Sequence, residues 1–378
     1  MDLNLSEDQA MLADLISRLC ADVFTPADLR AAEVSGAGFS QVLWGQLRAQ
    51  GLCGLAAPAE HGGLGLGAFE TALAYEQLGR ALAVTPHFTS CVLAARLVEA
   101  LGTAEQIERW LPALAAGEAW ISVAAIEPGG GFGRAGVRCR AEATADGLRL
   151  TGRKHFAPFA DGAARLIVLA RDAHDEIRAA LVDPQGPGVR LVRQRELAGE
   201  PHFVVDLDAA PAEALSASEV WGAWLEALLR GQVALAAQAV GAADQAHAIG
   251  VAYAKQREAF GRPIGGFQAV AHALAEVAVG VKGARALVWQ AAWAIDAGRA
   301  WPRLAAMARL KAGEVFRRAA ATAVQVHGGL GYTTACDAQL FFRRSKAWAA
   351  LNGDAAFLEG EIADLTLGPV PARETADV

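Results

Sequence analysis

The sequence predicts an α+β protein of several domains: an N-terminal α-helical domain, a middle antiparallel β-barrel domain and a C-terminal four-helix bundle. Apolar residues recur with a helical period at both ends of the chain, and the period changes to two between about Trp120 and Pro211. The length of 378 residues, 53% of them hydrophobic, leaves room for several domains with ample core. We expect domains at 1–118, 119–217 and 218–368, followed by a loose tail at 369–378.

Helices are expected throughout residues 6–117. Ser6 and Gln9 have the spacing of a capping box, in which each side chain accepts a hydrogen bond from the backbone N–H of the other residue. Apolar residues at helical spacing follow this box, which predicts a first helix there. Further helices are expected over 39–50 and 69–82.

A turn-rich segment, PAEHGGLGLG at 58–67, interrupts these helices. Its 63–68 stretch matches the pattern G-x-G-x-x-A. No buried strand precedes it, although a dinucleotide-binding fingerprint requires one. We therefore interpret the segment as a loop.

The middle domain is expected to contain short strands without intervening helices. Such strands favour an antiparallel barrel or sandwich over a parallel sheet. The expected strands cover 137–143, 148–151, 166–170, 180–182, 189–192 and 203–207. The helical pattern returns from Trp221 to about Leu365, with long Ala-rich runs at 225–256, 267–297 and 302–326. Their apolar character on nearly all faces is typical of a bundle core or an oligomer interface.

Composition excludes several classes of partner. The net charge is −7 and no basic block offsets it, which argues against nucleic acid and anionic membranes as partners. The polar N-terminus and the absence of a long apolar run argue against a signal peptide and a membrane span. Cysteines without paired spacing indicate a reduced, cytoplasmic protein with no disulfides and no metal site: Cys20, Cys53, Cys91, Cys139 and Cys336.

The segment 253–268, YAKQREAFGRPIGGFQ, carries the strongest indication of a binding site. Arg257 lies near the expected end of a helix, and a Gly-Arg-Pro turn follows it. A guanidinium in this place can present a fork to a phosphate. An arginine near a helix C-terminus also simply complements the helix dipole, so this segment alone leaves both interpretations open.

A second segment, QVHGGLGY at 325–332, completes the pattern. With these two segments, the PAEHGGLGLG loop and an IEPGGG turn at 126–131 in the same order and spacing, the chain resembles the acyl-CoA dehydrogenase family of flavoproteins over essentially its whole length. The resemblance implies FAD bound at the interface of a homotetramer or dimer of dimers, an acyl-CoA substrate and electron-transfer flavoprotein as the electron acceptor. The cofactor-binding residues it implies are Arg257, Phe260, Ile264, Phe267, Gln268, Gln325, Gly328, Gly329 and Phe156.

The middle domain departs from the family at the residues that hold the flavin ring. The family turn has the form T-E-P-x-x-G-S-D, and its threonine and serine supply hydroxyl groups. Here Ile126, Phe132 and Gly133 replace the threonine, the serine and the aspartate. The next family segment, K-x-W-I-T, is Lys154-His155-Phe156-Ala157-Pro158 in this chain. Phe156 can still stack on a ring, but Pro158 has neither a hydroxyl nor a backbone N–H.

Both family positions for the catalytic glutamate also lack a carboxylate. The resemblance places one position at Asn352 and the alternative position at Gly231, with Gln232 where an arginine is common. An amide cannot accept the α-proton of an acyl thioester as a carboxylate does. The acids that could substitute are Asp354, Glu226 and Glu359, although a solvated or helix-pairing role is also open to each.

Three functional hypotheses follow. In the first, the chain is the subunit without a catalytic base in an α2β2 acyl-CoA dehydrogenase, and it completes the FAD site of its partner. In the second, it is a self-sufficient flavoenzyme, either with an unusual base such as Asp354 or as a base-free monooxygenase. In the third, it is a non-enzymatic scaffold. The sequence does not select the acyl group; fatty acyl and steroid side-chain thioesters are both open.

Overall fold

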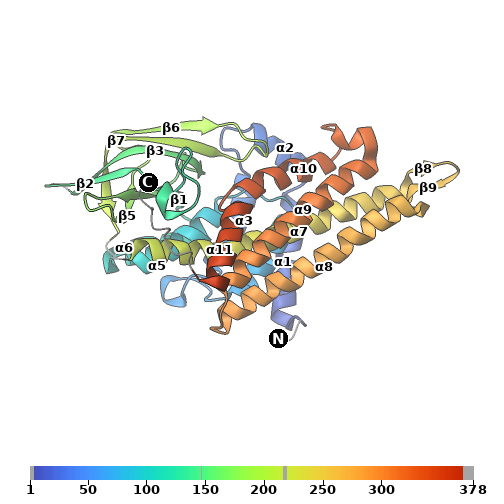
Figure 1. The fold of residues 1–378 in the computed structure, drawn as a ribbon, viewed down its shortest axis with the longest axis horizontal. Helices are drawn as coiled ribbons and strands as arrows, with labels where there is room; N and C mark the ends of the chain where they lie inside the picture. The colour runs from blue at the N-terminus through green and yellow to red at the C-terminus, as the bar shows by residue number, and fades with distance from the viewer. Residues whose placement is uncertain (1–3, 146, 216–218, 369–378) are drawn as a thin grey trace, which may run out of the picture.

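The computed structural model describes residues 4–145, 147–215 and 219–368. The expectation of a loose tail at 369–378 therefore lies outside the described residues. A β-domain lies at one end of the molecule, and long helices extend away from it to a small hairpin at the opposite end (Figure 1).

The N-terminal part is helical. Ser6 and Gln9 form the predicted capping box at the start of α1. The predicted helix at 69–82 ends earlier, because Leu82 has a positive φ of 52° and leaves the helical conformation. The helices are α1 (Glu7–Val23), α2 (Pro26–Val34), α3 (Gln41–Ala49), the 3-10 turns η1 (Leu52–Gly54) and η2 (Ala59–His61), α4 (Ala68–Arg80), the π-helix η3 (Phe88–Ala94), α5 (Ala95–Leu101) and α6 (Ala104–Ala115).

The middle part is the predicted β-barrel, accompanied by a short helical turn, η4 (Arg134–Gly136). Its strands are β1 (Ile121–Ala124), β2 (Arg140–Thr144), β3 (Gly147–Pro158), β4 (Arg165–Arg171), β5 (Ile177–Val182), β6 (Val189–Gln194) and β7 (His202–Ala214). The sheet closes on itself where β4 pairs with β5. Most neighbours are antiparallel, as predicted, but β1 pairs with β4 in parallel, and so do Arg140 of β2 and Arg171 of β4. Strand β1 was absent from the prediction.

Strand β2 also begins later than residue 137, where the sequence pattern placed it. The backbone N–H groups of Arg138 and Cys139 donate to the Glu127 carboxylate, each at 2.9 Å. Because these groups are bound by a side chain, they are not available to a neighbouring strand. The turn that precedes β2 is therefore fixed by a buried acid rather than by the sheet.

The C-terminal part is dominated by antiparallel helices at the predicted positions. They are α7 (Val220–Gln256), α8 (Gln268–Asp296), α9 (Pro302–His327), α10 (Ala338–Ala347) and α11 (Ala355–Leu367), with the short elements β8 (Glu258–Ala259), β9 (Arg262–Pro263), η5 (Ile264–Gly266), η6 (Gly328–Tyr332) and η7 (Trp348–Ala350). One hydrophobic core joins α1, α3 and α4 to α7, α8 and α9. A second core fills the inside of the β-domain. A third core joins β1, β4 and β5 to η3, α5, α6 and α7, so the sheet and the helices share buried apolar residues.

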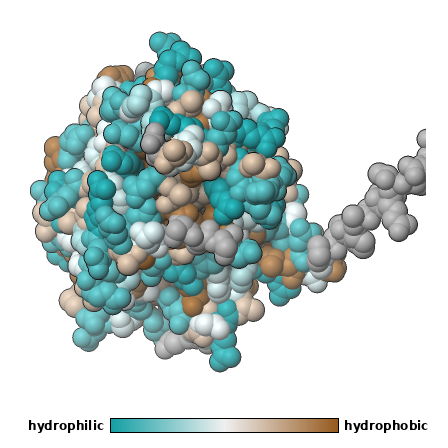
Figure 2. Space-filling view, turned by 90° about the vertical axis from the view of Figure 1, so that its left-hand side faces the viewer, coloured by the Kyte–Doolittle hydropathy of each residue, from teal (hydrophilic) through white to brown (hydrophobic). Residues whose placement is uncertain are grey.

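The face turned toward the viewer in Figure 2, on the β-domain side, is mostly hydrophilic, with hydrophobic residues gathered in a recess near its centre. None of the helices in the described ranges is long and apolar enough to cross a membrane.

Candidate functional site

The β8–β9 hairpin presents the first binding segment at the far end of the bundle. Helix α7 ends at Gln256, because Arg257 adopts an extended conformation while its N–H still donates to the Tyr253 carbonyl. The N–H of Ile264 then donates to the Arg257 carbonyl at 2.8 Å and closes the hairpin. At the tip, Phe260 has a φ of 52° and a 96% exposed surface. Its exposure leaves an aromatic ring available to a partner or ligand.

The second segment begins where α9 ends. Gly328 has φ 61° and ψ −141°, a conformation that suits glycine and strains other residues. A Cβ built on Gly328 or Gly329 would meet nothing within 4 Å, so the backbone of this pair is open to close approach. These are the properties of a peptide segment whose N–H groups can contact a phosphate.

An aromatic stack joins the two segments. The Tyr253 ring lies on the His327 ring with centroids 4.1 Å apart and an interplanar angle of 24°. Tyr253 lies one helical turn before Arg257, and His327 directly precedes Gly328. The Nδ1 of His327 lies 2.7 Å from the Ala323 carbonyl oxygen, which places a proton on this nitrogen. The stack therefore holds the arginine and the glycine pair at one end of the bundle.

The predicted cofactor residues divide between two places. One group lies at the bundle end and is exposed or partly exposed: Arg257, Phe260, Ile264, Phe267, Gln268, Gln325, Gly328 and Gly329. Phe267 packs under the Arg262 guanidinium at 4.2 Å and edge-on against Phe260 at 6.1 Å. Phe156 belongs to β3 in the β-domain, where its side chain is 38% exposed and its φ is 52°.

The β-domain turn keeps its shape through a buried ion pair that was not among the predicted site residues. The Nζ of Lys154 lies 2.6 Å from the Glu127 carboxylate, and these side chains are 0% and 6% exposed. Burial of Glu127 opposes its ionisation, but Lys154 and the two backbone N–H groups outweigh this effect and lower the pKa of the carboxyl. The signal was present, since Glu127 and Lys154 are residues that match the family segments.

The space beside this turn is nearly filled. Ile126, Phe132, Phe156, Pro158 and Asn352, which the resemblance placed around the flavin ring and the base, do converge, but the cavity they line encloses only about 30 Å³. A neighbouring cavity that shares Pro158 and Asn352 encloses about 80 Å³. The Phe132 ring packs against Phe357 of α11 with centroids 5.8 Å apart. These volumes hold a few waters and not a three-ring flavin.

Neither of the two residues that the resemblance assigns to the base position carries a carboxylate, and both are constrained by their neighbours. At Gly231, a Cβ would lie 3.1 Å from Cζ of Phe88, so the ring of Phe88 occupies the place of a side chain. Asn352 has a φ of 56°, and its carbonyl oxygen accepts a hydrogen bond from the Gln232 amide. The other amide atom of Gln232 accepts from Arg309 Nε at 3.1 Å, and burial lowers the pKa of Arg309 to about 10.

The candidate substitute acids have structural partners or lie in solvent. The Asp354 carboxylate accepts from the Phe357 N–H at 2.9 Å and caps α11. Glu226 accepts from Arg96 and Arg230; burial opposes its ionisation, but these hydrogen bonds outweigh it and lower the pKa of the carboxyl. Glu359 is exposed on α11. None of these three carboxylates is therefore placed to act as a base at the Asn352 position.

An exposed arginine, an exposed glutamine and an open glycine pair lie at the bundle end, and these are groups whose chemistry suits a diphosphate. The β-domain side of the same chain does not fit a flavin ring. A helical domain, a β-barrel and a helical bundle in this order form the architecture that the resemblance to flavin-dependent oxidoreductases implies.

Comparisons with known proteins agree with this class. The N-terminal domain model of acyl-CoA dehydrogenases matches residues 6–118, and the C-terminal domain model matches residues 221–365. The chain is 30% identical over 361 residues to the probable acyl-CoA dehydrogenase YngJ of Bacillus subtilis, covering 92% of this chain and 94% of that protein. It therefore belongs to the acyl-CoA dehydrogenase family, whose members are FAD-dependent oxidoreductases acting on a CH–CH bond.

Two solved structures are similar over nearly their full length. A steroid acyl-CoA dehydrogenase variant of Tcur3481–Tcur3483 is 33% identical with a TM-score of 0.86, covering 95% of this chain and 97% of that chain. The ChsE4–ChsE5 complex from Mycobacterium tuberculosis is 28% identical with a TM-score of 0.87, covering 98% of this chain and 100% of that chain.

Proposed function

We propose that this chain is the subunit without a catalytic base in a heteromeric acyl-CoA dehydrogenase, and that it completes the FAD site of a partner chain. The complex performs α,β-dehydrogenation of an acyl-CoA thioester. The observation that carries the proposal is the contrast between an exposed phosphate-binding end and a filled ring site in the same molecule. The bundle end leaves its polar groups accessible to a cofactor, whereas the ring site in the β-domain is occupied by side chains.

In this proposal the chain contributes binding rather than proton transfer. Arg257 offers a bidentate fork to the diphosphate, and the Gly328 and Gly329 N–H groups approach the same oxygens. Phe260 and Phe267 supply apolar surface to the adenine or the flavin. FAD supplies the acceptor for the hydride that leaves the β-carbon of the acyl group. The base that removes the α-proton belongs to the partner, since Asn352 and Gly231 cannot take that role.

The names of two similar structures support a two-component assembly. Tcur3481–Tcur3483 and ChsE4–ChsE5 each name a pair of chains, and the former is called a steroid enzyme. By this likeness we propose a heterotetramer with a dehydrogenase-like partner, acting on a bulky acyl-CoA such as a steroid side-chain thioester. Electron-transfer flavoprotein remains the proposed acceptor.

A self-sufficient enzyme would require rearrangement of the chain around Asn352. Asp354 would have to leave the N-terminus of α11, and Phe88 and Phe132 would have to vacate the space of the ring. A base-free monooxygenase would still need that space. A pure scaffold would not need an exposed arginine, glutamine and glycine pair at the bundle end.

The test is flavin content with and without a partner. The chain is purified alone and after co-expression with a dehydrogenase-like chain that carries the glutamate. We expect no flavin absorbance and no acyl-CoA oxidation from the lone chain, and about one FAD per heterodimer with turnover from the complex. Stoichiometric flavin and turnover in the lone chain would refute the proposal. Flavin content that is unchanged by Arg257→Ala in the complex would favour the scaffold.

A further inference from the structure

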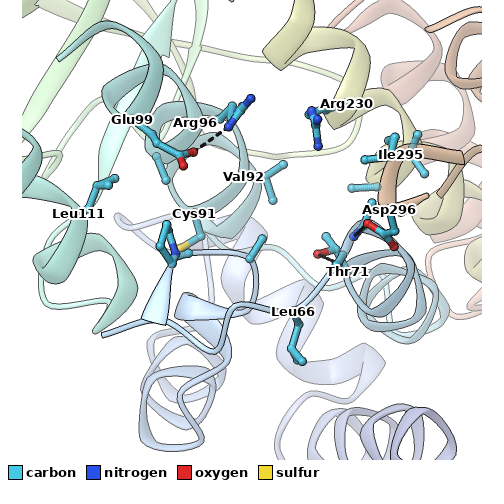
Figure 3. A pocket seen from close by; sticks show the side chains of 18 residues that line it. Leu66, Thr71, Cys91, Val92, Arg96, Glu99, Leu111, Arg230, Ile295 and Asp296 are labelled. Atoms are coloured by element: carbon cyan, nitrogen blue, oxygen red, sulfur yellow. Dashed lines mark hydrogen bonds and ion pairs between the residues drawn. The ribbon is translucent and has the colours of Figure 1, made fainter. Parts of the chain in front are cut away.

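A cavity that the proposed function does not use lies between the N-terminal helices and the bundle. It encloses about 260 Å³, far more than the spaces beside Asn352. Its walls come from η3, α5 and α7, from the ends of α4 and α8 that face each other, and from the loop before α4 (Figure 3). An apolar cavity of about 150 Å³ is enough to bind benzene, so this one has room for a small organic molecule with a polar head.

The interior of this cavity is aliphatic and its rim is charged. The apolar lining includes Leu66, Val92, Leu111, Val233 and Ile295, with no aromatic side chain among the lining residues. The charged lining residues are Arg96, Glu99, Arg230 and Asp296. The arginine side chains are each 36% exposed, which places them where the cavity meets solvent. A ligand that fits must have an aliphatic body and a polar or charged end.

The two arginines differ in the hydrogen bonds they have left to make. Arg96 donates Nη1 to Glu99 at 2.8 Å, and Nε and Nη2 to Glu226 at 3.2 Å each, so its fork is fully used. Arg230 donates only Nε, also to Glu226, and its guanidinium lies over Trp301 at 5.2 Å. Its Nη1 and Nη2 have no hydrogen-bond acceptor within the described part of the chain. Arg230 therefore presents an unused fork that matches a carboxylate.

The carboxylates around the cavity favour a ligand that also carries a positive charge. Asp296 accepts the N–H groups of Ala68 and Phe69 at 2.7 and 2.9 Å, and it lies on the same side of the cavity as Arg230 (Figure 3). With Glu99 and Glu226, three carboxylates stand against two guanidiniums. This excess of negative charge repels a simple anion. A ligand with an ammonium group beside its carboxylate is not repelled, because its positive charge offsets the excess.

We propose that this cavity binds a small aliphatic α-amino acid. The carboxylate lies on the Nη1 and Nη2 atoms of Arg230, the ammonium group faces Asp296, and the side chain enters the space between Val92, Val233 and Ile295. The site is separate from the flavin half-site and does not depend on the proposed function.

The proposal is tested by isothermal titration calorimetry on the full chain. The ligands are L-leucine, 4-methylpentanoate, which lacks the ammonium group, and 3-methylbutylamine, which lacks the carboxylate. We expect saturable binding of leucine. Each analogue should bind roughly tenfold more weakly than leucine, or weaker still, because each loses one charge-assisted contact. Absence of saturable leucine binding, or equal binding of either analogue, would overturn it.

Two variants test the location from different directions. Arg230→Gln removes the fork, and Val92→Phe fills the cavity from a partly exposed position without changing any charge. We expect each to weaken leucine binding roughly tenfold or more, while circular dichroism shows an intact fold. Arg18→Gln is the matched control, because Arg18 also pairs with a carboxylate one turn away, on exposed α1. Unchanged leucine binding in folded Val92→Phe would place the ligand elsewhere and refute the site.

Discussion

The two halves of the proposed cofactor site differ in how they are packed. The bundle end keeps its polar groups exposed around Arg257 and Gly328, whereas the β-domain side is packed with Phe88 and Phe132. The difference has a physical cause. Polar groups at a helix end are solvated when no ligand is present, so keeping them costs little. An empty apolar pocket instead costs about 24 cal/mol per Å³, so a chain that does not bind a ring there is stabilised when side chains fill the space.

The largest effect should come from the buried ion pair of the filled half. Lys154→Ala removes the partner of Glu127, whose side chain is 6% exposed. Breaking a buried pair leaves an uncompensated charge and costs about 3–5 kcal/mol. We expect that loss in the free energy of unfolding, measured by urea denaturation.

The double variant Glu127→Gln with Lys154→Met is the control, since it removes both charges. Its unfolding free energy should lie closer to that of the wild type than to that of Lys154→Ala. The lowered pKa of Glu127 adds a pH dependence: its stabilising contribution is complete above the unfolded-state pKa and is lost as pH falls through the folded-state value. A Lys154→Ala chain as stable as the wild type would mean that the turn is not held by this pair.

The next effect concerns the exposed half. Arg257→Ala in the proposed heteromeric complex should weaken FAD binding roughly 10- to 150-fold, which corresponds to the loss of about 1.5–3 kcal/mol from charged hydrogen bonds. Flavin release during dialysis and fluorescence titration of the apo-complex measure it. Arg262→Gln in the same hairpin is the matched control, because its guanidinium already lies on the Phe267 ring. Equal losses in both variants would show that charge alone, and not the Arg257 fork, holds the diphosphate.

The exposure of the bundle-end residues was predictable from the sequence, whereas the packing around the β-domain turn was predictable only in part. Arg257, Gln325 and Gly328 lie in contiguous motifs at helix ends, where local geometry determines what they present. The sequence also shows that Ile126 and Phe132 depart from the family pattern. It does not show that Phe88 fills the space beside Gly231, because that contact joins residues far apart in the sequence. The parallel pairing of β1 with β4 was missed for the same reason, since strand periodicity carries no information about the partner strand.

A third experiment asks whether a base can be returned to the filled half. Gly231→Glu drives a side chain into the Phe88 ring, where a Cβ alone would lie 3.1 Å from Cζ. We expect a loss of about 1–3 kcal/mol from overpacking and no acyl-CoA oxidation. Gly222→Glu on the same helix is the matched control, because a Cβ there meets nothing within 4 Å. A smaller loss from Gly231→Glu in a Phe88→Ala background than in the wild type would confirm that the ring of Phe88 is the obstacle, and a neutral effect of Gly231→Glu alone would contradict it.

The smallest effect should appear where the two exposed segments are joined. Tyr253→Leu removes the ring that stacks on His327 at 4.1 Å, an interaction worth about 0.5–1.5 kcal/mol. FAD affinity of the complex should therefore fall roughly 2- to 10-fold, by loosening Gly328 relative to Arg257 rather than by removing a direct contact. Tyr253→Phe keeps the ring and should leave affinity unchanged, which fluorescence titration can resolve. If Tyr253→Phe weakens FAD binding as much as Tyr253→Leu, the hydroxyl itself contacts the cofactor and the stack is not what positions the two segments.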